Sequence, residues 1–89
     1  MAGFNAEQGK GYMVNTTAEA YTATLPASPT VGKSVGFADY AKKFGTNALT
    51  ISGNGKYIEG SGSPLILNTN GVGCILTYID ATRGWIVTG

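Results

Sequence analysis

The stretch LILNTNGVGCILTYI, residues 65–79, decides the fold class. It holds two apolar runs, 65–67 and 74–76, and neither run alternates with polar residues as a strand exposed on one face should. The dipeptide Asn70-Gly71 between the runs favours a tight two-residue turn, because both positions tolerate positive φ. We therefore predict a β-hairpin of strands 65–69 and 72–79 that carries apolar side chains on both faces.

Short strand-like segments separated by turn residues continue on both sides of this stretch. Tyr21, Ala23 and Leu25 alternate with threonines, and this period of two indicates a half-buried strand. Pro26 ends that strand, because proline cannot donate to a ladder. The predicted strands are 11–15, 21–25, 34–40, 48–52, 57–58, 65–69, 72–79 and 85–88. The sequence thus predicts an all-β fold, a small antiparallel sandwich or barrel of about seven to eight short strands.

The length of 89 residues suits one domain. We divide the chain into an N-terminal arm, residues 1–10, and a single β domain, residues 11–89. The arm contains Phe4 and little else that could form a core, so we expect it to lie across a neighbouring subunit with Phe4 as its anchor. Residues 38–44 are the one helical candidate, a single turn that ends at Gly45.

The composition argues against several classes of function. The chain has one cysteine, Cys74, and no histidine, so an intramolecular disulfide cannot form and the ligand set for zinc is poor. Only 12% of the residues are charged and the net charge is +1, which leaves no basic face for nucleic acid. No segment reaches the ~18 apolar residues of a membrane span, and no secretory signal is visible. We therefore expect no cofactor, no metal, no nucleic acid and no membrane partner, and synthesis in a cytoplasm.

The residue types in this sequence give little support for a catalytic site. Without histidine the usual nucleophile–base pairs are missing, the five acidic residues are spread singly along the chain, and Cys74 lies in an apolar run where it acts as a small hydrophobe. Residues 27–34, ASPTVGKS, fit a relaxed phosphate-binding loop. However, Pro29 removes an amide donor, and strand-like residues follow where that loop requires a helix. We expect that the chain is not an enzyme.

Apolar residues in excess of what one small sheet needs point to self-association. They are explained either by a closed barrel with an added layer or by a second subunit, and we favour the subunit. Fourteen glycines raise the entropy lost on folding, and small domains without disulfides or metals commonly gain stability by oligomerisation. We expect a homo-oligomer whose interface contains Phe4, Leu65, Ile66, Leu67, Trp85, Ile86 and Val87.

Several turn and core motifs together resemble a β module of bacteriophage structural proteins, including tail-fibre chains. These motifs are GYMVNT at 11–16, TLPASP at 24–29, DYA at 39–41, FGTNALTI at 44–51, NG at 54–55 and YIDATRGW at 78–85. The resemblance covers residues 9–88 and concerns the fold more than the function. No catalytic residue is implied by it.

The matching region begins eight residues after Met1 and ends at the edge of the chain, so the chain is similar to a free-standing module of the capsid decoration, or cement, type. This resemblance implies a trimeric virion protein, assembled in the host cytoplasm, that binds itself and the phage major capsid protein and stabilises the head shell. The alternative is a tail-fibre or receptor-binding module that recognises a host surface.

Overall fold

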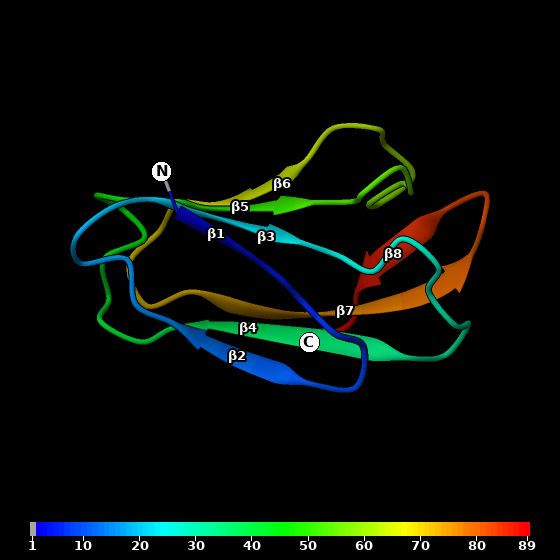
Figure 1. The fold of residues 1–89 in the computed structure, drawn as a ribbon, viewed down its shortest axis with the longest axis horizontal. Helices are drawn as coiled ribbons and strands as arrows, with labels where there is room; N and C mark the ends of the chain where they lie inside the picture. The colour runs from blue at the N-terminus through cyan, green and yellow to red at the C-terminus, as the bar shows by residue number, and fades with distance from the viewer. Residues whose placement is uncertain (1) are drawn as a thin grey trace.

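The computed structural model describes residues 2–89. Eight short strands in this range form two four-stranded sheets that pack face to face as a sandwich (Figure 1). The strands are β1 (Ala2–Asn5), β2 (Gly11–Val14), β3 (Tyr21–Thr24), β4 (Ser34–Asp39), β5 (Leu49–Ser52), β6 (Leu65–Leu67), β7 (Gly73–Asp80) and β8 (Gly84–Val87). One sheet has the order β1-β3-β5-β6 and the other has the order β2-β4-β7-β8. The all-β sandwich predicted from the sequence is confirmed.

The first five strands alternate between the two sheets, and this alternation sets the direction of neighbouring strands (Figure 1). The chain reverses at each connection, so strands two apart in sequence run the same way. Accordingly, β1 pairs in parallel with β3, β2 with β4, and β3 with β5. Antiparallel pairing is found where β6, β7 or β8 takes part. The sheets are therefore mixed, whereas a wholly antiparallel arrangement was expected from the assumption that consecutive strands pair.

The hairpin predicted over residues 65–79 is not formed. β6 pairs with β5 in one sheet, whereas β7 lies between β4 and β8 in the other. Gly71 has a positive φ of 81°, but Asn70 is not among the described residues with positive φ, so the tight turn that pairs consecutive strands is absent. Instead the chain crosses between the sheets, and Asn70 Oδ1 accepts a hydrogen bond of 2.8 Å from the backbone N–H of Gly45.

Two smaller expectations also change. Residues 38–44 contain no helix, because β4 extends to Asp39 and the residues after it form turns. The predicted strand 57–58 is reduced to isolated bridges from Ile58 to Ser61 and Trp85. Within residues 2–89, no helix has the length and apolar composition to cross a membrane.

Alternate side chains of each strand fill the space between the sheets. Of the residues that the period of two places inward, Tyr21 is half-buried and the others are buried, namely Ala23, Leu25, Val35, Phe37, Leu49, Ile51, Cys74, Leu76 and Tyr78. Trp85 is 0% exposed, and its ring packs edge-on against Tyr78 with a centroid distance of 5.5 Å. Gly84 has a positive φ of 73°, and a Cβ there would collide with the carbonyl of Tyr57. This close approach holds the segment 57–60 against β8.

The first residues belong to the sandwich and do not form a separate arm. β1 pairs with β3 along all four of its residues. Phe4 packs against the core, and its ring centroid lies 5.1 Å from that of Tyr12. Ala6, which follows the strand, is buried. Phe4 is thus in contact with its own chain, while Met1 of the predicted arm lies outside the described residues.

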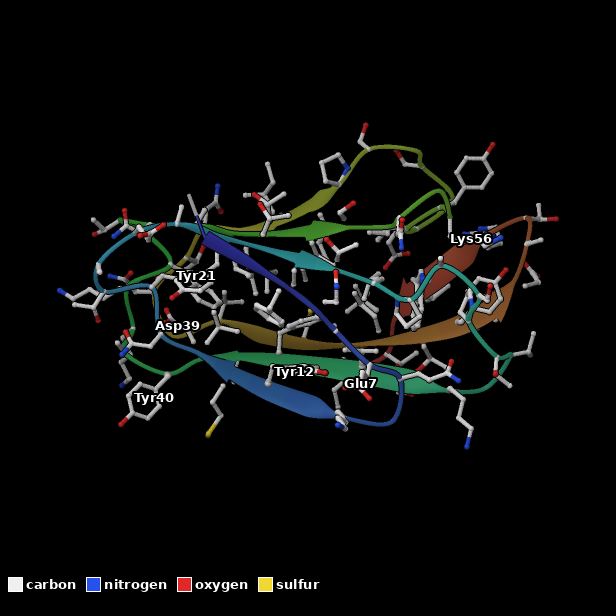
Figure 2. The ribbon with its side chains drawn as sticks, in the orientation of Figure 1. Glu7, Tyr12, Tyr21, Asp39, Tyr40 and Lys56 are labelled. Carbon is white, nitrogen blue, oxygen red and sulfur yellow. The ribbon has the colours of Figure 1, made fainter. Side chains whose placement is uncertain are left out.

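Asp39 ties two loops together at one end of the sandwich (Figure 2). Its carboxylate accepts backbone hydrogen bonds from Lys43 at 3.0 Å, from Phe44 at 3.0 Å and from Gly71 at 2.9 Å. Burial of the carboxylate raises its pKa, but the hydrogen bonds from Phe44, Gly71, Lys43 and Lys42 lower it by more. The pKa of Asp39 therefore lies below its ordinary value of 3.8.

A carboxylate with a lowered pKa stabilises the fold above its ordinary pKa, and this contribution is lost as the pH falls through the folded-state pKa. For Asp39 the loss is expected below pH 3.8. The variant Asp39→Asn is expected to be less stable than the wild type at neutral pH, and the difference should shrink on acidification. Urea midpoints of both proteins between about pH 7 and about pH 2.5 measure this. An unchanged difference at the acid end would contradict the role of the charge.

Candidate functional site

The outward face of the β2-β4-β7-β8 sheet is the candidate functional site, and we call it the apolar face. It carries no charged residue. The register places on it Gly11, Met13, Ser34, Gly36, Ala38, Gly73, Ile75, Thr77, Ile79, Ile86 and Thr88. The polar side chains of this set bond to one another, with Thr77 Oγ1 lying 2.8 Å from Ser34 Oγ and 2.9 Å from Thr88 Oγ1. The remainder of the face offers only apolar contact.

Three large apolar side chains protrude from this face. Met13 is 76% exposed, Ile75 is 46% exposed and Ile79 is 40% exposed. Charge normally keeps the outside of a sheet solvated, so large apolar side chains exposed on an uncharged face mark a contact surface. The outward face of the other sheet differs, because β3 and β5 place Thr22, Thr24, Thr50 and Ser52 there.

A shallow groove of about 500 Å³ runs over the apolar face. Its floor is made of residues without long side chains, which the register brings side by side: Gly11 beside Gly36, and Ala38 beside Gly73. We call the three glycines, Gly11, Gly36 and Gly73, the glycine floor. Met13 and Ile75 also line it. A Cβ added at Gly11 would meet no atom within 4 Å, so the hollow at Gly11 is open to a visiting side chain.

A second hollow, of about 290 Å³, lies beside the edge strand β2 and is lined by Phe4, Tyr12, Met13, Val14, Asn15 and Tyr21. Figure 2 shows the side chains of Tyr12 and Tyr21 between the two sheets. The ring centroids of Tyr12 and Phe37 are 5.9 Å apart and stacked. The Tyr12 hydroxyl also accepts a hydrogen bond of 2.7 Å from the backbone N–H of Glu7. These aromatic rings are therefore held by their own chain, and Met13 stands between the two hollows.

A third groove has mixed chemistry. It measures about 320 Å³ and is lined by Thr50, Ser52, Gly53, Asn54, Gly55, Lys56, Tyr57, Gly62 and Pro64. Tyr57 is 48% exposed there. An exposed aromatic ring beside hydroxyl and amide groups is a combination that can contact a sugar or a peptide.

The residues that the sequence predicted as one interface are spread through the molecule. Trp85 is 0% exposed and Leu67 is 8% exposed, so both are occupied inside the chain. Ile66 is 51% exposed on the outside of β6, while Ile86 lies on the apolar face of the other sheet. Val87 is 39% exposed at the edge strand β8, and Leu65 and Phe4 are half-buried against the core. The structure thus places only Ile86 of this set on the apolar face.

Sequence reasoning missed Met13, Ile75, Ile79 and the glycine floor. The alternation along 73–80 could have found Ile75 and Ile79, because they fall on the face opposite the buried Cys74, Leu76 and Tyr78. The floor could not be found that way, since Gly11, Gly36 and Gly73 become neighbours only through strand pairings that the sequence does not reveal.

The remaining reactive groups do not converge. In the part of the chain that the structure describes, no three histidine, cysteine or acidic side chains come together as a metal site. Burial raises the pKa of the Cys74 thiol, which keeps it in the less reactive protonated form. The stretch 27–34 is a turn region that leads into strand β4, and no helix follows it. No protein-family model and no curated protein matches the chain.

Proposed function

We propose that this chain is a bacteriophage virion structural protein, a capsid decoration or cement protein that associates with copies of itself and with the major capsid protein to stabilise the head shell. The observation that carries the proposal is the uncharged apolar face, with Met13, Ile75 and Ile79 exposed on it. Such a face favours a protein that works while packed against neighbours.

The resemblance of residues 9–88 to a module of phage structural proteins supports this setting. Attachment to a shell needs a surface that can pack against other subunits, and the apolar face is suited to that purpose. The part of the face around Ile79 and Ile86 lies away from the glycine floor and is available for the shell.

A tail-fibre or receptor-binding module is the second candidate. It is favoured by the groove beside Tyr57, whose hydroxyl, amide and aromatic groups suit a saccharide on a host surface. The two candidates differ in abundance, because cement covers the head whereas a receptor binder sits on the tail in few copies.

Purified virions separate these candidates. A denaturing gel is expected to show this chain in amounts comparable to the major capsid protein, and immunolabelling is expected to place it on heads. A trace band confined to tails would support the receptor-binding module instead. Absence from virions would contradict both.

A charge on the apolar face tests the attachment surface directly. The variant Ile79→Lys is expected to bind heads at least about ten-fold more weakly, because a lysine forced into an apolar contact costs more than ~1.4 kcal/mol. Thr50→Lys is the matched control, since it adds the same charge to the outward face of the other sheet. Retention on heads after dilution measures both. Equal loss by the two variants would show that total charge matters and not the apolar face.

A further inference from the structure

The strand β2 ends its sheet with an unprotected edge. The carbonyls of Lys10 and Val14 accept hydrogen bonds of 3.0 Å from Gly36 and from Tyr40, so these groups face β4. Because backbone groups alternate in direction along a strand, the N–H and C=O groups of Gly11 and Met13 face the opposite way, out of the sheet. Among the described residues no strand pairs with that side of β2.

The edge at β8 shows how this chain covers an edge. There the backbone N–H of Trp85 donates to Tyr57 O, the N–H of Glu59 donates to Trp85 O, and the N–H of Val87 donates to Glu59 Oε1. Natural proteins protect open edges with such covers, with lysine or proline in the strand, or with bulges. The strand β2, Gly-Tyr-Met-Val, has no charge and no proline, and its pairing with β4 has no register shift.

The shape of β2 is complementary to itself. If two copies of β2 pair antiparallel with Tyr12 on a two-fold axis, Gly11 of each copy lies opposite Met13 of the other. Both residues point their backbone groups at the partner, so each Gly11–Met13 pair exchanges two hydrogen bonds. On the apolar face, the protruding Met13 side chain of one copy then covers the open hollow at Gly11 of the other. The two-fold axis makes this contact twice.

We infer that two copies of this chain join through β2 into one continuous eight-stranded sheet, with each Met13 seated over Gly11 of the other copy. The inference deepens the proposed self-association and rests on it. We choose a second copy as the partner because the protruding Met13 and the hollow at Gly11 lie two residues apart on the same strand. In an antiparallel two-fold pair, each Met13 then meets the Gly11 of the other copy, so the contact is closed. The uncharged edge offers no complement to a partner of either charge. The assembly unit is therefore a dimer, where the family resemblance implied a trimer.

Disulfide trapping tests this register. In a Cys74→Ala background, a mixture of the single variants Gly11→Cys and Met13→Cys is expected to form a covalent dimer under mild oxidation. Cα atoms of a hydrogen-bonded antiparallel pair lie about 5.5 Å apart, within the range of a disulfide. Each variant alone should crosslink far more slowly, because residues 11 and 11, or 13 and 13, are then offset by two positions along the strands and lie beyond ~7 Å. Crosslinking of either variant alone as readily as the mixture would overturn the inference.

A charge swap tests the same pairs without a covalent bond. In sedimentation at about 100 µM, chosen because contacts of limited area are often only micromolar, the wild type is expected at twice the mass of one 9.1 kDa chain. The double variant Gly11→Lys/Met13→Lys places lysines opposite each other and should be monomeric, whereas Gly11→Glu/Met13→Lys should restore the dimer. Circular dichroism confirms folding, and the open space at Gly11 and the 76% exposure of Met13 make both variants compatible with it.

A wild-type monomer, a trimer, or two double variants that behave alike would each overturn the inference. Failure of this contact can be told apart from failure of the proposed function. A dimer with the expected crosslink from a protein absent from virions would refute the cement role and leave the contact standing. A head-bound protein without the crosslink would refute the β2 contact and leave the cement role standing.

Discussion

Replacement of Trp85 by alanine is expected to destabilise the folded chain by about 3–5 kcal/mol, the cost of removing a large buried aromatic side chain. Trp85 is 0% exposed, and its ring packs against Tyr78. Its strand also holds the segment 57–60 through the backbone contacts with Tyr57 and Glu59. A domain of this size is stable by only about 5–15 kcal/mol, so this loss should be plain in a urea titration of the purified protein.

Two control variants sharpen this result. Trp85→Phe should cost clearly less than the alanine variant, because it keeps a large ring and removes an indole N–H that has no hydrogen-bond partner among the described residues. Ile66→Ala should change the urea midpoint little, since Ile66 is 51% exposed. If Trp85→Ala lost less than ~1 kcal/mol, the tryptophan would not be central to the core of a single chain.

Deletion of residues 1–8 is expected to destabilise the chain by roughly 3 kcal/mol, which is about the combined value of one half-buried large side chain, one buried small side chain and the β1–β3 hydrogen bonds. The deletion removes every β1–β3 pair, the Phe4 ring beside Tyr12, and the buried Ala6, whose N–H donates to Thr24 O at 2.8 Å. It also leaves the edge of β3 that faces β1 without a partner strand. The measurement is the urea midpoint of the truncated and full-length proteins.

Point variants separate the side chain from the strand. Phe4→Ala should account for a large part of the loss, whereas Asn5→Ala, at an exposed position of the same strand, should be nearly neutral. An unchanged midpoint in the truncated protein would mean that residues 1–8 behave as the separate arm expected from the sequence. The structure predicts the opposite.

The sequence predicted which faces of the strands are buried wherever the period of two was clear. Val35 and Phe37 in β4, and Cys74 and Leu76 in β7, were assigned inward and are buried, because alternation is a local property of the chain. β1 was missed, since Phe4 is its one large apolar side chain and a single such residue sets no period.

Strand partners and the candidate site could not be predicted from the sequence, because both depend on contacts between distant segments. Asn70-Gly71 carries a local turn preference, but the burial of apolar side chains from β6 and β7 in different sheets overrides it. Trp85 was assigned to an interface because an apolar run does not show whether its second face meets the same chain or another. The glycine floor depends on the register of three strands, which no local pattern encodes.

The alternation of the first five strands between the sheets also bears on how the chain folds. No strand from β1 to β4 pairs with the next strand in the sequence. Each pairs only with strands at least two positions away, so pairing requires that the more distant strand has also been made. The short turn between β7 and β8 joins the most local pair, and it lies at the far end of the chain. Topologies dominated by distant pairings fold in milliseconds to seconds, because loop closure precedes any gain from contact. On the ribosome, the early strands therefore emerge before β7 can close the second sheet, and they remain exposed to pairing with other chains until β7 has been made.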